Sequence, residues 1–137
     1  MEVIVFPDTE EDVRAHLASE LPLFGADVPA HIKLPTDRPS EFVRVYRVGG
    51  PRRDAFTDNG SYALEGWAQT ESRALALLNI ARGIVNALPG HTIGESRVYT
   101  TREFAGPGLL PDPISKQSRY TLTVSIAVRG SVRERED

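Results

Sequence analysis

The sequence contains no cysteine, and this absence excludes several classes of structure and chemistry. A chain without cysteine has no disulfide scaffold, no thiolate nucleophile and no Cys-ligated zinc or iron–sulfur site. Long apolar runs are also missing, since nowhere do about 18 apolar residues follow one another. The N-terminus has no basic region followed by an apolar segment. We therefore expect neither export nor a membrane span.

Charge and motif content exclude other functions. The formal net charge of −3 gives no general attraction to nucleic acid. The three histidines, His16, His31 and His91, stand far apart and form no metal-binding pair. No serine lies in a G-x-S-x-G elbow, and no glycine-rich loop has the Lys-Ser or Lys-Thr ending that cradles phosphate. We predict a protein without catalytic, metal-binding or cofactor-binding residues, and hence not an enzyme.

The most strongly patterned stretch runs from Thr70 to Leu88 and predicts an amphipathic helix. Its apolar residues recur at the three- and four-residue spacing that places side chains on one helix face. Thr70 has an oxygen that can cap the first turn, and Pro89-Gly90 ends the pattern. The buried face is expected to contain Leu77, Leu78, Ala81, Ile84 and Val85.

The same stretch has a second stripe of mostly small residues: Ala76, Ile80, Gly83 and Ala87. Small side chains would allow another helix or a neighbouring chain to approach closely. The alternative interpretation is a half-exposed flank of good helix formers, because alanine is common on any helix.

Further elements are predicted on both sides of this helix. Asp8, with Glu11 three residues later, is typical of a helix start. The helix that follows has an apolar stripe at Val13, Leu17 and Leu21, and Pro22 and Gly25 end it. Three segments rich in β-branched and aromatic residues predict strands, and Ser96 to Phe104 alternates more weakly. The three segments are Glu41 to Val48, Ser61 to Ala68 and Tyr120 to Val128.

The last of these strands has the clearest alternation of the chain. Leu122, Val124 and Ile126 lie on an apolar face that we expect to cover the long helix, and the other face is polar but uncharged. This order of elements predicts an α+β domain with an antiparallel-rich mixed sheet and two main helices packed on its apolar face. We expect one domain over residues 1–130 and a charged, flexible C-terminal tail over 131–137.

Two long loops and one aromatic residue complete the pattern. The segments Gly49 to Gly60 and Gly106 to Ser118 are rich in Gly or Pro and have no apolar period. Asp58-Asn59-Gly60 predicts a hairpin turn at the end of the first loop. Trp67, at a strand–helix junction, is interpreted as closing one end of the core. The predicted partner contacts, in the loops and on the small-residue stripe, are Arg52, Arg53, Asp54, Ala76, Gly83, Ala87, Leu109, Leu110 and Asp112.

Several of these features together resemble one family. RPSEFVRVYRVGG is followed by an aspartate-containing loop, a strand ending in Trp67-Ala68 and the long Ala/Leu helix. GPGLLPDPISKQSRYTLTVSIAVRG then begins at Gly106. This arrangement resembles the tail terminator proteins of long-tailed bacteriophages, also known as head–tail connector or tail completion proteins. The resemblance covers roughly residues 9 to 130, and its most specific part is Pro111-Asp112-Pro113 before Arg119-Tyr120.

The resemblance implies a virion protein that assembles in the cytoplasm of a bacterial host. Such a subunit forms a ring, usually a hexamer, at the head-proximal end of the tail. The ring contacts the tail tube protein and a neck protein, stops tube polymerisation and joins tail to head. No membrane is involved, and DNA at most passes through the lumen. The alternatives are a neck or head-completion protein and, from another class, a small-ligand-binding α+β enzyme domain.

Overall fold

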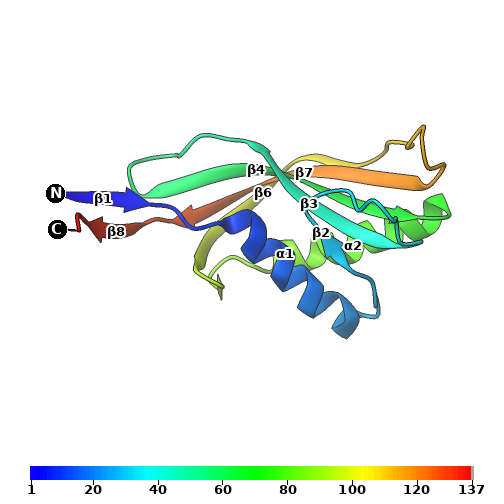
Figure 1. Ribbon diagram of the computed structural model, residues 1–137, viewed down its shortest axis with the longest axis horizontal. Coiled ribbons are helices and arrows are strands. Elements are labelled where there is room, and N and C mark those ends of the chain that lie inside the picture. Colours follow the sequence, from blue (N-terminus) through cyan, green and yellow to red (C-terminus); the bar gives the residue numbers. More distant parts are fainter. Residues whose placement is uncertain (137) are drawn as a thin grey trace.

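In the computed structural model, which describes residues 1–136, the long helix expected from the sequence is α2, Glu71–Asn86 (Figure 1). Thr70 caps it, and its Oγ1 accepts a hydrogen bond from the backbone N–H of Arg73 at 3.2 Å. Its apolar face is fully buried. Gly66 of the neighbouring strand allows the helix to approach closely, because a Cβ at this position would collide with the carbonyl oxygen of Ala74.

The N-terminal helix also matches the sequence pattern. Helix α1, Thr9–Glu20, begins after Asp8, whose side chain accepts from the backbone N–H of Glu11 at 3.2 Å. A short 3₁₀ turn, η1 (Leu21–Phe24), follows it. Gly25 then ends the turn in the left-handed conformation, with φ of 85°, which glycine adopts without steric cost. Val13, Leu17 and Leu21 are completely buried.

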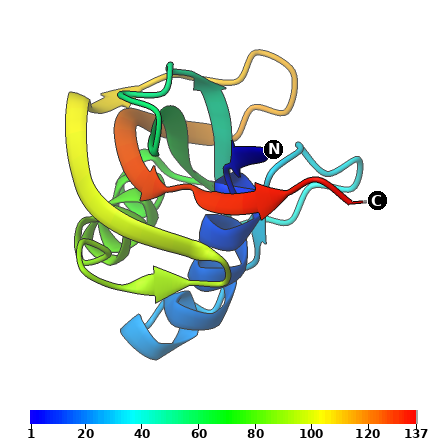
Figure 2. The ribbon, with the colours of Figure 1, turned by 90° about the vertical axis from the view of Figure 1, so that its left-hand side faces the viewer.

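A six-stranded sheet lies above the two helices, as Figure 1 shows. Its strand order is β2-β3-β4-β7-β6-β5, and all neighbours are antiparallel except β2 and β3. The strands are β2 (Ala30–His31), β3 (Phe42–Gly49), β4 (Thr57–Ala68), β5 (Thr92–Ile93), β6 (Ser96–Leu109) and β7 (Ser118–Arg129). Strand β6 has three register shifts against β7, and Figure 2 shows that it curves around one side of the molecule.

One hydrophobic core fills the space between the helices and the sheet. The predicted α2 face packs in this core with Leu122, Val124 and Ile126 of β7, and each of these strand residues is at most 2% exposed. Residues of α1, β3 and β4 complete the same core. The α+β class, the mixed sheet and the packing of both helices on its apolar face are therefore confirmed.

The two ends of the described chain form a separate two-stranded sheet. Strand β1 (Glu2–Val5) pairs antiparallel with β8 (Ser131–Glu134). Figure 1 shows this ribbon projecting from one end of the molecule, with both termini at its tip. The expectation of a flexible tail over 131–137 is wrong for residues 131–134, because the N-terminal segment supplies a pairing partner. Residue 137 lies outside the described residues.

Both predicted loops are shorter than expected. Strand β4 already begins at Thr57, so Asp58-Asn59-Gly60 pairs with β7 within the sheet and is not a hairpin turn. Strand β6 extends to Leu109 and β7 begins at Ser118, so the second loop spans only 110–117. Pro107 is tolerated in β6 because it lies at an irregularity of pairing between Ala105 and Gly108.

Candidate functional site

A groove of about 950 Å³ lies between α1 and α2, and we call it the α1–α2 groove. Helix α1 contributes Ala15, His16 and Glu20, and α2 contributes Ile80, Gly83 and Ala87. Three residues of the small-residue stripe, Ile80, Gly83 and Ala87, thus lie in a hollow between two helices. A Cβ built at Gly83 meets no atom within 4 Å, so the floor of the groove is open there.

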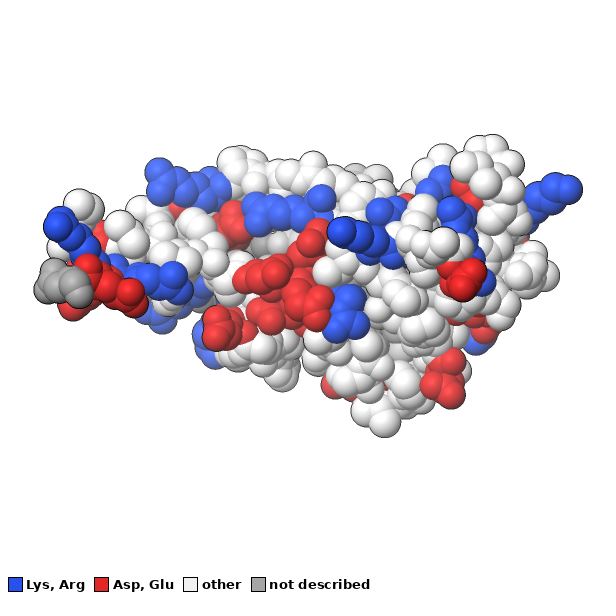
Figure 3. Space-filling model, viewed as in Figure 1, with Lys and Arg blue, Asp and Glu red and all other residues white. Residues whose placement is uncertain are grey.

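The ends of the groove differ in chemistry. At one end, Asp12 accepts from Ser96 Oγ at 2.7 Å and from the backbone N–H of Glu95 at 3.2 Å, which ties α1 to the turn before β6. Phe24 of η1 also lines the groove, and it is 63% exposed. Figure 3 shows acidic side chains gathered where α1 begins, and Glu10, Glu11 and Asp12 form its first turn. The groove therefore has both apolar and polar lining residues, and it is acidic beside the start of α1.

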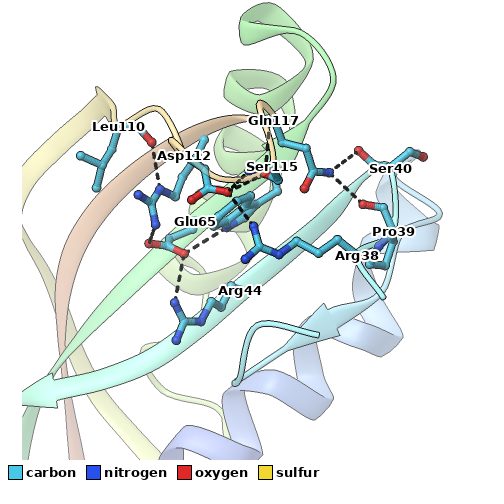
Figure 4. Close-up of polar contacts among 11 residues, drawn as sticks. Arg38, Pro39, Ser40, Arg44, Glu65, Leu110, Asp112, Ser115 and Gln117 are labelled. Carbon is cyan, nitrogen blue, oxygen red and sulfur yellow. Dashed lines mark hydrogen bonds and ion pairs between the residues drawn. The ribbon is translucent and has the colours of Figure 1, made fainter. Parts of the chain in front are cut away.

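A second candidate lies on the opposite face of the sheet, around the buried carboxylate of Glu65 (Figure 4). Glu65 is 1% exposed and accepts from Trp67 Nε1 at 3.0 Å and from Tyr46 Oη at 3.4 Å. Arg44 Nη1 lies 3.6 Å and Arg119 Nη1 3.8 Å from its oxygens. The two guanidinium groups compensate the buried charge, which would otherwise be strongly unfavourable.

Aromatic stacking continues the same cluster. Trp67 stacks on Phe42 with ring centroids 5.2 Å apart and an angle of 14° between the planes. The guanidinium carbons of Arg119 and Arg38 lie 4.9 Å and 5.2 Å from the Trp67 ring centroid, in the range of cation–π contacts. The side chains around Glu65 contact one another through hydrogen bonds, ion pairs and stacking. The cluster is therefore suited to stabilising the second face of the sheet and the loops beside it.

The 110–117 loop is tied to the body of the subunit at both ends. Asp112 Oδ2 accepts from Ser115 Oγ at 2.5 Å, from the backbone N–H of Ser115 at 2.9 Å and from Arg38 Nη1 at 2.7 Å. These hydrogen bonds from Ser115, with the Arg38 charge, lower the pKa of Asp112 to about 2. Asp112, expected as a partner contact, is thus already occupied within the subunit, where it shapes the loop.

Two further hydrogen bonds anchor this loop, as Figure 4 shows. Gln117 is buried, and its Nε2 donates to the carbonyl of Pro39 at 2.9 Å. Arg119 Nε donates to the carbonyl of Leu110 at 2.9 Å. The apolar side chains of the loop remain outside this network, and Leu110 is 46% and Ile114 83% exposed.

The other predicted contact residues are distributed over several surfaces. Arg52, Arg53 and Asp54 are exposed in the loop between β3 and β4, beside the exposed Phe56. The backbone N–H of Phe56 donates to Asp54 at 2.9 Å and lowers the pKa of that carboxyl group. The structure brings Gly83 and Ala87 together in the groove, whereas Ala76 is exposed on α2 outside its lining. Leu109 is exposed at the end of β6.

The Glu65 cluster and the exposure of Ile114 were not predicted from the sequence. One signal for the cluster was present, because Glu65 and Trp67 are two residues apart and a strand places such residues on one face. The arginines of the cluster are Arg38, Arg44 and Arg119. No local sequence pattern at these positions predicts that their side chains lie together. Among residues 1–136, no group of three or more His, Asp or Glu side chains is placed to hold a metal ion.

No protein-family model and no curated protein matches the sequence. Among solved structures, the chain is similar to a chain from the "virion of native gene transfer agent (GTA) particle". The TM-score is 0.54 at 12% sequence identity, and the match covers 88% of this chain and 94% of that chain. At this identity the match shows a shared fold. No helix in the described part of the chain is long and apolar enough to cross a membrane.

Proposed function

We propose that this protein is a tail terminator, a structural virion protein that forms a ring, of six copies, at the head-proximal end of a phage tail tube. The observation that carries the proposal is the fold shared with a chain of a gene transfer agent virion over nearly the full length of both. The motif run that ends in Arg129-Gly130 resembles the tail terminator proteins and supports the proposal from the sequence.

The surfaces of the subunit are consistent with this role. A closed ring needs a heterologous interface, in which two different patches meet around the circle. The α1–α2 groove and the exposed 110–117 loop supply two such patches, and the loop with Arg52, Arg53 and Asp54 supplies a third. In this proposal the partners are further copies of the chain, the tail tube protein and a neck protein. Assembly requires no catalytic group.

The test combines imaging with genetics. Electron microscopy of the purified protein should show rings, and six copies of the 15.1 kDa chain would have a mass of roughly 90 kDa. Deleting the gene should leave heads and tails unjoined, with tails of irregular length. Normal joined particles from the deletion strain would overturn the proposal. Ring closure can depend on the tail tube as a template, so rings are also sought on isolated tails.

A neck or head-completion protein is the second candidate, because the fold match names the particle and not the position within it. A density map of the tail distinguishes the two. A tail terminator contacts the last ring of tube protein, whereas a neck protein lies between that ring and the head.

A further inference from the structure

The 110–117 loop has the properties of a preorganised binding element. Ile114 is 83% exposed, although it is a large apolar residue in a loop held by Asp112, Gln117 and Arg119. An element that is already ordered loses little conformational entropy on binding. Lys116 is exposed two residues after Ile114. The loop therefore presents an apolar side chain and a positive charge in a defined shape.

The α1–α2 groove has complementary properties. Its floor at Gly83 is open, and Ala15, Ile80 and Ala87 are apolar parts of its lining, which also contains polar residues such as Ser19 and Asn79. Asp12 and Glu20 add negative charge to its lining. An occupant with one apolar side chain and a neighbouring lysine satisfies both the shape and the charge of this groove.

The loop and the groove of one subunit do not meet each other. In Figure 1 the 110–117 loop lies at the upper right, on the sheet side of the molecule, and α1 and α2 lie below the sheet. Figure 3 shows basic side chains mainly along the sheet side and acidic ones below it, at the start of α1. Two copies placed head to tail would bring opposite charges together.

We propose that the 110–117 loop of one copy docks in the α1–α2 groove of the next copy. Ile114 enters the groove over Gly83, and Lys116 faces Glu20. Each copy uses its loop on one neighbour and its groove on the other, which is the head-to-tail contact that a closed ring requires. This inference rests on the proposed ring function and specifies which two surfaces form the interface.

Crosslinking tests the contact directly, because the natural chain has no cysteine and each introduced thiol is unique. The double variant Ile114→Cys/Gly83→Cys, treated with a short bismaleimide, should give a ladder of covalent multimers that ends at the ring size. Each single variant should give no ladder. Equal mixtures of the two single variants should give dimers that contain one copy of each.

Charge exchange tests the specificity of the contact. Ile114→Asp replaces an apolar side chain by a carboxylate in a groove that already contains Asp12 and Glu20, so self-association should weaken at least about tenfold. Lys116→Glu should weaken association too, and Lys116→Glu combined with Glu20→Lys should restore part of the loss. Analytical ultracentrifugation measures these constants, and circular dichroism checks that each variant is folded. Ile114→Val, which keeps an apolar side chain, is the matched control.

The outcomes separate this inference from the function on which it rests. Rings visible by electron microscopy without a ladder in the double variant would overturn the loop–groove contact and leave the ring function in place. Normal self-association of Ile114→Asp would also overturn the contact. A chain that remains monomeric at every concentration, and is absent from tails, would overturn both.

Discussion

The indole N–H of Trp67 donates to Glu65 at 3.0 Å, and both side chains are at most 1% exposed. The two residues lie on the face of β4 that points away from the main core. A buried carboxylate normally costs free energy unless charges and donors compensate it. Here Trp67, Tyr46, Arg44 and Arg119 provide that compensation. The second face of the sheet therefore contains a buried polar cluster in which the Glu65 carboxylate has defined partners.

The first prediction concerns this carboxylate. Glu65→Ala leaves Trp67 Nε1 without its acceptor and removes the partner of two guanidinium groups, so it should lower the free energy of unfolding by about 3–5 kcal/mol. Glu65→Gln keeps an acceptor oxygen and should cost less. Urea unfolding followed by the fluorescence of Trp67, the only tryptophan of the chain, measures both. A loss below about 1 kcal/mol for Glu65→Ala would contradict this account.

The second prediction concerns the main core. Leu78 is completely buried between α2 and the sheet, and Leu78→Ala should cost about 2–5 kcal/mol through lost burial and a residual cavity. The exposed Ile114 is the control, because Ile114→Ala should change the stability of the isolated subunit by less than about 0.5 kcal/mol. Denaturant unfolding compares the two. Equal losses would show that Leu78 does not contribute as a core residue.

The third prediction compares Gly66 of β4, which contacts α2, with Gly83, which lies within α2. Gly66→Ala places a Cβ against the backbone of α2 at Ala74 and Leu78, so we expect a loss of about 1–3 kcal/mol as the elements are pushed apart. Gly83→Ala meets open space and lies inside α2, so it should stabilise the isolated subunit by up to about 1 kcal/mol. Thermal unfolding gives the sign of each change. A stabilising Gly66→Ala would be inconsistent with this close approach.

The fourth prediction concerns pH. The pKa of Asp112 falls from 3.8 to about 2 in the folded chain, chiefly through hydrogen bonds from Ser115. A lowered folded pKa means that the carboxylate stabilises the loop fully above pH 3.8 and loses this effect as the pH falls through about 2. The protection factor of the Ser115 amide, which is the intrinsic exchange rate at each pH divided by the measured rate, should therefore be high at pH 4 and fall towards pH 2.

A variant supplies the control for this titration. Asp112→Asn should already show a low protection factor for the Ser115 amide at pH 4, with little further change on acidification, because the charged acceptor is gone. Loss of protection near pH 4 in the natural chain would mean that Asp112 has an ordinary pKa.

Local patterns were sufficient for the elements that depend on local chemistry. The period of α2, its cap at Thr70 and the alternation of β7 predicted both the helix and the strand that it covers. The N-cap of α1 could also be predicted from the sequence, because a capping oxygen accepts from backbone N–H groups only two or three residues away. The placement of Gly83 and Ala87 beside one another also followed from helical spacing alone.

Only the tertiary structure decided the features that join distant segments. Asp58-Asn59-Gly60 has a strong local turn preference, yet it forms part of β4 because β7 supplies a pairing strand and Arg47 binds Asp58 at 2.6 Å. The charged residues after Gly130 form β8 because β1 lies beside them. The arginines at 38, 44 and 119 meet around Trp67 and Glu65 for the same reason. Local propensities are worth about 1 kcal/mol per residue or less, and pairing or burial against a distant segment exceeds that preference.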